Sequence, residues 1–471
     1  MSIVGMGLDF EGKPLFQPID ENAFEQSLIN ALALNADRLE RSTKATATGF
    51  AFLGQVQRRG IDLGDPLEAG WSFLVNKNDA QLSDIKAILE PLARHRGMSD
   101  PQSPLVFNNE PAEDWFEWLH DSYYALDLEG KKTPDYILIV GGPESVPFHF
   151  QSLLDTMASV GRVAFDNLDD LKRYVDKLLR LESAKEPTVS REALFFAPDG
   201  GPNDPTHFSR QYMAEPLADH VKAKLKFTVQ SVTGDEATKP NLLAALRGHK
   251  PALVYTASHG LGAIGQSLDV QKRYNGAICC QHSGSLTLDA LFAGDDVPCN
   301  GPFLEGAVFF QFACFGYGTP AESDYSHWTD GVPKKYASID FVASLPKQLL
   351  AHPRGPIAYV GHLDTAFLHA FADPKAPATL ERWNNRIAPF VKAVNQLLAV
   401  QPSGFAMRDM GQRFSDCNTL LTYTYDRDRR GKQNWTPEAR ARFLDTWITR
   451  SDAQNYMVFG DPAAHLQIPS E

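Results

Sequence analysis

Cysteine is scarce in this sequence, which has five cysteines among 471 residues. A disulfide framework requires an even and denser set, so we expect free thiols in a reducing compartment. The segment 279–282, Cys-Cys-Gln-His, lacks the paired C-x2-C spacing of structural zinc sites, and we therefore expect neither a metal nor a cofactor. The cysteines are Cys279, Cys280, Cys299, Cys314 and Cys417.

Basic residues and long apolar runs are also in short supply. The formal net charge is −13, which opposes binding to nucleic acid or to anionic lipid. No apolar run approaches the roughly 20 residues that a membrane span needs. The start, residues 1–16, lacks the basic region and long apolar stretch of an export signal. We expect a soluble, cytoplasmic protein without nucleic-acid or membrane partners.

The length predicts more than one structural unit. A chain of 471 residues exceeds what a single hydrophobic core usually spans. No period of 20 to 50 residues repeats, which argues against solenoids and propellers. We divide the chain into an accessory N-terminal α/β region, residues 1–130, and a main domain, residues 131–471.

The order of apolar runs predicts an α/β fold. Short buried strands separated by helices favour a mostly parallel sheet with helices on both faces, because each crossover returns the chain to the same edge. The expected strands are 70–75, 136–140, 193–197, 227–232, 253–256, 307–312 and 356–360. The expected helices are 23–41, 82–96, 168–181, 211–225, 240–247, 380–400 and 437–449. Residues 98–133 are expected to form an irregular connection and the charged run 423–432 a solvated loop.

Two of these strands end on reactive side chains. His259 and Gly260 follow one strand, and Cys314 follows another, with Gly316 close behind. Because the carboxyl ends of neighbouring parallel strands meet at one edge, we expect His259 to act as the base and Cys314 as the nucleophile. The amides of Gly260 and Cys314 would then form an oxyanion hole. A capped histidine and a buried structural thiol are the alternative.

Other histidines compete for the role of base, and several carboxylates compete for substrate binding. His362 also follows a strand, but no glycine follows it, and we prefer His259. Asp199 and Asp204 lie in a loop at the same edge and are candidates to bind a basic substrate residue, although turn chemistry alone explains that loop. Asp324 and Asp330 are equally tenable, and Arg273 would suit an acidic substrate. The remaining competing histidines are His282, His327 and His369.

The residues around these positions resemble the caspase-like cysteine peptidases. Gln311-Phe-Ala-Cys314-Phe-Gly316 is similar to the caspase motif Gln-Ala-Cys-x-Gly, with one extra residue. The segment 136–147, the segment 160–165 and the Gly-Asp-Pro ending at 460–462 look closer to gingipain-type and CHAT-type bacterial proteases. The resemblance covers roughly residues 134–466 and implies a caspase-like fold with a His259–Cys314 dyad.

The resemblance also implies a role. It suggests an intracellular cysteine endopeptidase, a regulated effector in antiviral defence or cell death that cleaves protein partners, with a preference for a basic residue before the cut. It further suggests a zymogen that an upstream protease or regulator activates, through residues 1–130 or through cleavage. If the enzyme favours basic residues, the processing points would be Arg427, Arg429, Arg430 and Lys432. The alternatives are a catalytically silent interaction module and an acyl-transfer enzyme with a deep closed pocket.

Overall fold

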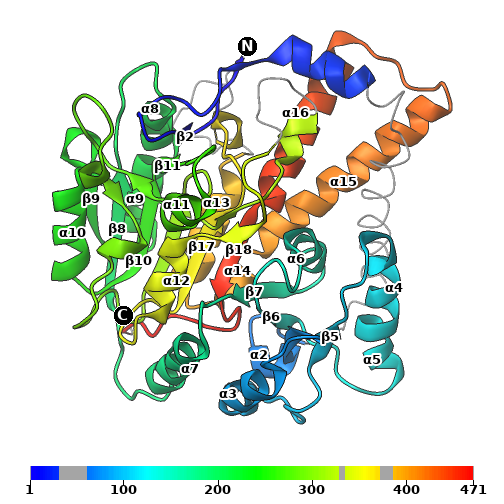
Figure 1. Cartoon of the computed structure of the whole chain (residues 1–471), viewed down its shortest axis with the longest axis vertical. Helices are drawn as coiled ribbons and strands as arrows, with labels where there is room; N and C mark the ends of the chain where they lie inside the picture. Colours follow the sequence, from blue (N-terminus) through cyan, green and yellow to red (C-terminus); the bar gives the residue numbers. More distant parts are fainter. Residues whose placement is uncertain (1, 31–60, 328–334, 372–385, 470–471) are drawn as a thin grey trace.

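A ten-stranded sheet forms the centre of the molecule (Figure 1). The computed structural model describes residues 2–30, 61–327, 335–371 and 386–469. The strand order is β5-β4-β6-β7-β18-β17-β14-β10-β8-β9. The first half comprises β4 (Trp71–Asn76), β5 (Leu105–Phe107), β6 (Tyr136–Val140), β7 (Ser159–Val163) and β18 (Tyr456–Gly460). The second half comprises β8 (Ser190–Ala197), β9 (Thr228–Thr233), β10 (Pro251–Ala257), β14 (Val308–Phe312) and β17 (Ala358–His362).

Within each half all neighbouring strands are parallel, and β17 meets β18 antiparallel. The two halves therefore direct their carboxyl ends to opposite edges. Strands such as β10 and β14 are buried along their whole length, as expected of parallel strands covered on both faces. The predicted mostly parallel α/β sheet with helices on both faces is confirmed (Figure 1).

Many of the helices lie in the crossovers between strands, and α13 to α16, over residues 388–454, follow one another before the last strand, β18. The longer ones are α3 (Leu82–His95), α7 (Leu168–Glu182), α9 (Glu215–Lys224), α10 (Lys239–Gly248), α12 (Ser344–Ala351), α13 (Ala388–Leu398), α15 (Arg408–Arg429) and α16 (Pro437–Gln454). The shorter ones are α2 (Pro66–Ala69), α4 (Trp115–Trp118), α5 (Ala125–Leu128), α6 (Phe148–Leu154), α8 (Pro205–Ser209), α11 (Leu268–Tyr274) and α14 (Ser403–Ala406). None of the helices in the described ranges combines the length and apolar character needed to cross a bilayer.

Three small sheets accompany the large one in the described part of the chain. A four-stranded sheet has the order β13-β12-β11-β2, and two further sheets pair β1 with β3 and β15 with β16. Their strands are β1 (Ser2–Ile3), β2 (Gly7–Leu8), β3 (Ile19–Asp20), β11 (His259–Leu261), β12 (Ile278–Cys279), β13 (Leu291–Phe292), β15 (Gly318–Thr319) and β16 (Phe341–Val342). The four-stranded sheet joins the start of the described chain to the segment that carries His259, because β2 pairs with β11.

The sheet continues across the expected boundary at residue 130. Strand β4 pairs with β6 from Trp71 opposite Tyr136 to Val75 opposite Val140, and β5 pairs with β4. The division into residues 1–130 and 131–471 stays a prediction. The large sheet has no break at this boundary among the described strands.

Three sequence predictions differ from the structure. Residues 98–133 were expected to form an irregular connection, but they contain β5 and a continuous helical stretch over residues 112–128, so that prediction is wrong. The run 423–432 was expected to be a solvated loop, but α15 continues to Arg429, so that prediction is wrong. The exposed face of a long helix has the same charged composition, and Asp426 pairs with Arg430 one helical turn later. The helix expected over 23–41 is present over 21–30, and its remainder lies outside the described residues.

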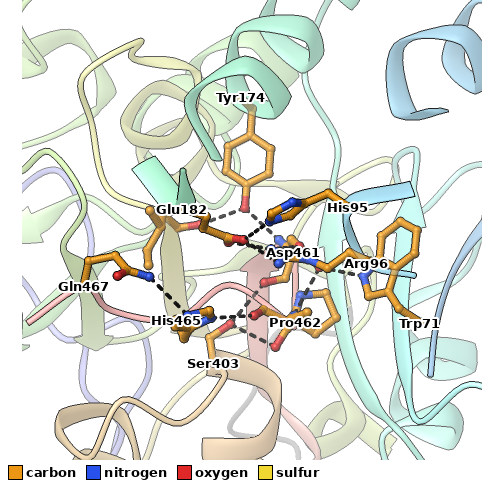
Figure 2. A network of polar contacts seen from close by, with 12 residues as sticks. Trp71, His95, Arg96, Tyr174, Glu182, Ser403, Asp461, Pro462, His465 and Gln467 are labelled. Atoms are coloured by element: carbon orange, nitrogen blue, oxygen red, sulfur yellow. Dashed lines mark hydrogen bonds and ion pairs between the residues drawn. The ribbon is translucent and has the colours of Figure 1, made fainter. Parts of the chain in front are cut away.

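A buried ion network supports the edge at which β18 ends (Figure 2). Arg96, which follows α3, is 5% exposed and contacts Glu182 at 2.5 Å and Asp461 at 2.7 Å. The indole N–H of Trp71 donates to Asp461 at 2.8 Å. Burial would raise the pKa of Glu182, but His95 and Arg96 outweigh it and lower that pKa to about 2. The network ties α3 and α7 to the last strand.

Candidate active site

The register of β10 and β14 brings His259 and Cys314 to the same edge. Ala257 lies opposite Phe312 in this parallel pair, and the amide of Ser258 donates to the Phe312 carbonyl oxygen at 3.1 Å. His259 and Cys314 each lie two residues beyond that last pair. The chain thus places the two residues that the strand ends predicted at the same edge of the sheet.

Gly260 fixes how closely the two segments approach. A Cβ atom at Gly260 would lie 1.9 Å from the carbonyl oxygen of Cys314 and 2.9 Å from its nitrogen. No other residue type fits there without moving the backbone. The glycine after the histidine therefore lets the backbone of β11 pack directly on the backbone of Cys314.

His259 is held by a carboxylate that the sequence had not assigned to it. Its Nε2 atom lies 2.9 Å from both carboxylate oxygens of Asp204, and the residue is 6% exposed. The Nδ1 atom is buried and has no hydrogen-bond partner among the described residues. Because a carboxylate accepts from Nε2–H, the lone pair of the neutral ring is left on Nδ1. His259 is therefore oriented with one basic nitrogen available.

Asp204 is fixed as the N-cap of α8. Its carboxylate accepts from the backbone N–H of Thr206 at 2.8 Å, and Pro205 begins the helix. Burial would raise the pKa of Asp204, but hydrogen bonds and charge from His259 and hydrogen bonds from Thr206 lower it to about 2. The carboxylate of Asp204 faces His259. Its predicted role in binding a substrate residue stays a prediction. The turn-like composition of the loop around Asp204 did not indicate that this residue would hold His259.

Cys314 is fully buried in this structure. Its Sγ atom accepts from the backbone N–H of Ala366 at 3.2 Å. Burial raises the pKa of the thiol, and the backbone of Ala366 and Met6 opposes this effect. Phe315, the next residue, has a left-handed φ of 57° and donates its N–H to the Asp364 carbonyl oxygen. A tight turn at Phe315 thus holds the sulfur of Cys314 against the segment 364–366.

The predicted oxyanion donor at Gly260 has a partner. Its backbone N–H donates to the carbonyl oxygen of Met6 at 3.2 Å. A peptide carbonyl from the start of the chain therefore occupies the donor that we assigned to the substrate's oxygen.

The other predicted substrate-binding carboxylates are also paired. Asp199 contacts Arg210 at 2.8 Å and His207 at 3.0 Å. Asp324 contacts His149 at 3.3 Å and Arg450 at 3.7 Å. Asp330 lies outside the described residues. The candidate for an acidic substrate, Arg273, is exposed and pairs with Asp295.

The competing histidines have other contacts. The Nδ1 atom of His362 is 2.8 Å from the Asp364 carbonyl oxygen, and His369 contacts Asp445. His282 lies 3.0 Å from the Cys280 carbonyl oxygen, and His327 lies on the short 3-10 helix Asp324–His327. Among the predicted bases in the described ranges, His259 is the one adjoining a glycine packed on the Cys314 backbone.

The carboxyl group of Asp364, whose backbone carbonyl oxygen accepts from Phe315, makes the stability of the fold depend on pH. Burial raises its pKa to about 6, although Ser323 and the Thr365 amide oppose this. A carboxyl group with a raised folded-state pKa contributes stability below its unfolded pKa, and this is lost as pH rises through about 6. We expect Asp364→Asn to gain about 2 to 3 kcal/mol relative to the natural chain between pH 4 and pH 7. Urea unfolding at four pH values measures this, and a pH-independent difference would contradict it.

Comparisons with known proteins return structures and no sequence families. No protein-family profile and no curated protein matches the sequence. The Arg-specific cysteine proteinase gingipain R matches at 14% identity and a TM-score of 0.42, covering 84% of this chain and 78% of that chain. The complex of Porphyromonas gingivalis RgpB pro- and mature domains matches at 14% identity and 0.43, covering 84% and 80%.

A third match is the Saccharomyces cerevisiae separase–securin complex. It has 11% identity and a TM-score of 0.34, and the match covers 86% of this chain and 20% of that chain. The gingipain-type proteases that the residue patterns resemble are thus also present among the structural matches. These TM-scores are all below 0.5, so any function of this chain has to be argued from the contacts of the site itself.

Proposed function

We propose that this chain is a cysteine endopeptidase in which Cys314 is the nucleophile and His259 is the general base. The observation that carries the proposal is the Asp204–His259 pair beside the Cys314 backbone, which leaves Nδ1 of the imidazole without a partner. A carboxylate that orients an imidazole toward a nucleophile is the arrangement on which acyl-transfer catalysis depends. Asp204 is then a positioning residue.

The proposed chemistry needs no cofactor. Nδ1 of His259 takes the thiol proton as the sulfur of Cys314 bonds to the carbonyl carbon of the substrate. The carbon–nitrogen bond then breaks, and the imidazolium returns the proton to the leaving amine. Water attacks the thioester with His259 as base, the carbon–sulfur bond breaks, and the thiol is restored. The backbone amides of Gly260 and Cys314 stabilise the oxyanion.

The finer role is part of the proposal and follows from the resemblance of the motifs. We place the enzyme in the cytoplasm as a regulated zymogen that cleaves protein partners, and antiviral defence is the pathway that the resemblance suggests. A preference for a basic residue before the cut would need an unpaired carboxylate, and the described contacts of Asp199, Asp204 and Asp324 give it no support.

The test is hydrolysis of fluorogenic peptides that vary the residue before the cut. Because Met6 and Gly7 cover the thiol, the assay includes Gly7→Val, whose Cβ would lie 2.3 Å from Leu15. We expect hydrolysis that Cys314→Ala abolishes. If the chain and its Cys314→Ala variant are equally inactive in both backgrounds, while binding a partner equally well, the silent interaction module is supported instead.

A further inference from the structure

The start of the chain is bound across the candidate site as an extended strand. Strand β2 pairs in parallel with β11, with Gly7 opposite Gly260 and Leu8 opposite Leu261, and Figure 1 shows the two side by side. One step earlier, Gly5 forms an antiparallel bridge with Phe367. The segment 4–8 therefore lies between β11 and the segment 365–368.

Backbone hydrogen bonds hold this segment on both sides. The N–H of Met6 donates to the Ala366 carbonyl oxygen at 2.9 Å, and the N–H of Leu368 donates to the Val4 carbonyl oxygen at 3.0 Å. On the other side, Gly260 donates to the Met6 carbonyl oxygen and Gly262 donates to that of Leu8. Proteins that recognise peptides by strand addition use such main-chain contacts, which accept many sequences.

The Met6–Gly7 peptide bond lies where a scissile bond is expected. The carbonyl oxygen of Met6 accepts from Gly260, which is the proposed oxyanion donor. A Cβ atom at Gly7 would lie 3.4 Å from the Sγ atom of Cys314. The carbonyl oxygen of Met6 thus contacts the proposed oxyanion donor, the Gly260 amide, and Gly7 lies next to the proposed nucleophile, the Cys314 thiol.

The following residues fold back and cover the segment. The N–H of Leu15 donates to the Gly7 carbonyl oxygen at 3.0 Å, and β1 pairs with β3. Cβ atoms at Gly5 and Gly7 would lie 2.6 Å from the ring of Phe16 and 2.3 Å from Leu15. A side chain at either glycine would therefore displace Phe16 or Leu15 of this cover. We call residues Ser2–Asp20 the clasp.

The helix at 21–30 secures the clasp to the body of the molecule. Phe24 is 1% exposed and packs its ring perpendicular to Trp447 of α16, with centroids 5.4 Å apart. Trp447 in turn packs on Tyr325, which packs on Phe367 beside the bound segment.

We propose that residues 4–8 are an intramolecular ligand of the peptide-binding groove, with the Met6–Gly7 bond in the place of the scissile bond. The inference rests on the proposed peptidase function and adds its regulation and substrate class. With the clasp in place, the thiol is sealed and the chain is latent. When the clasp leaves, the amides of Gly260 and Leu368 and the Ala366 carbonyl oxygen become free to bind a substrate strand.

The bound segment also indicates which substrates fit. The Met6 side chain is fully buried and belongs to the main apolar cluster, which also contains Phe315 and Phe367 from the body of the molecule, so its place suits an unbranched apolar residue before the cut and disfavours a charged one. The close contacts at Gly5 and Gly7 come from Phe16 and Leu15 of the clasp itself. They are released with it, and the neighbouring substrate positions then tolerate larger residues.

The experiment displaces the clasp by point substitution in the full chain. Gly7→Val clashes with Leu15, and Met6→Asp places a charge in a fully buried position, so the two variants act by different means. Glu11→Val changes an exposed residue at the turn of the same clasp and is the matched control. Rates of Cys314 alkylation by iodoacetamide, mapped by mass spectrometry, are measured alongside hydrolysis of acetyl-Ile-Val-Gly-Met-coumarin, with circular dichroism to confirm folding.

We expect alkylation and hydrolysis to rise at least about tenfold in both displaced variants and to stay unchanged in Glu11→Val. If the natural chain is alkylated at Cys314 and hydrolyses the peptide as fast as folded Gly7→Val and Met6→Asp do, the proposal that the clasp covers the site is overturned. The proposal of a peptidase would remain intact. Faster alkylation without hydrolysis of any peptide would support the clasp as a cover and overturn the peptidase.

Two further arms test the groove itself. A synthetic peptide of residues Ser2–Asp9 should compete with the fluorogenic substrate in Gly7→Val, and failure to compete would contradict groove binding. The methionine peptide should be cleaved at least about tenfold faster than its arginine counterpart. The reverse order would overturn the proposed substrate class.

Discussion

Replacing Asp204 with asparagine is expected to lower kcat/KM by about 10³- to 10⁴-fold, as loss of the orienting carboxylate does in serine-protease triads. The asparagine amide would donate to Nε2 of His259, which moves the ring proton to Nδ1. The nitrogen that should accept the thiol proton would then already carry one. The measurement is steady-state hydrolysis in whichever background, natural or Gly7→Val, is more active.

The asparagine variant keeps the helix start, which separates catalysis from folding. Asparagine caps helices about as well as aspartate does, so α8 should persist. Asp65→Asn makes the same change at the N-cap of α2, away from the site, and should leave kcat/KM unaltered. If Asp204→Asn retained full activity, the His259–Asp204 contact would have no part in catalysis.

Replacing Arg96 with methionine is expected to lower the free energy of unfolding by about 3 to 5 kcal/mol, because it leaves buried carboxylates without their cation. Glu182 and Asp461 both contact this guanidinium, and their side chains are 6% and 0% exposed. Methionine retains much of the length of the arginine stem, so the loss is mainly one of charge and hydrogen bonds. Urea unfolding at pH 7 measures the effect.

Arg94→Met is the matched control for this prediction. Arg94 is on the last turn of α3, has a 62% exposed side chain and pairs with Glu90, so its loss should cost at most about 0.5 kcal/mol. The Arg96 effect should shrink as pH falls from 7 towards about 2, because burial without Arg96 raises the pKa of Glu182 above the value of about 2 that it has in the natural chain, so Glu182 takes up its proton at a higher pH in the variant. Equal effects of the two substitutions would contradict the importance of the buried network.

The strand framework of the second half was predictable because its runs are short, apolar and regularly spaced. The expected strands 253–256 and 307–312 lie on β10 and β14, and His259 and Cys314 follow these two strands. Burial on both faces forces continuous apolar runs, so the pattern is strong where the strands are central. This framework was sufficient to place His259 and Cys314 at one edge.

The rest of the site left little trace in the sequence. Asp204 lies in a loop of Pro, Asp, Gly and Asn that any turn would use, so its contact with His259 depends on tertiary structure. Strand β2 has two residues, Gly7 and Leu8, and is flanked by Met6 and Asp9, which gives no alternation to detect. The clasp forms because its backbone finds partners more than two hundred residues away.

Covalent labelling of the released chain is the most direct test of the claim that Cys314 and His259 act together. A peptidyl acyloxymethyl ketone is incubated with Gly7→Val, and the adduct is mapped by mass spectrometry. The account predicts a single adduct on Cys314 that His259→Ala reduces at least about a hundredfold, which is the lower range for loss of a general base. An adduct on Cys279 or Cys417, or a Cys314 adduct that forms equally fast without His259, would contradict it.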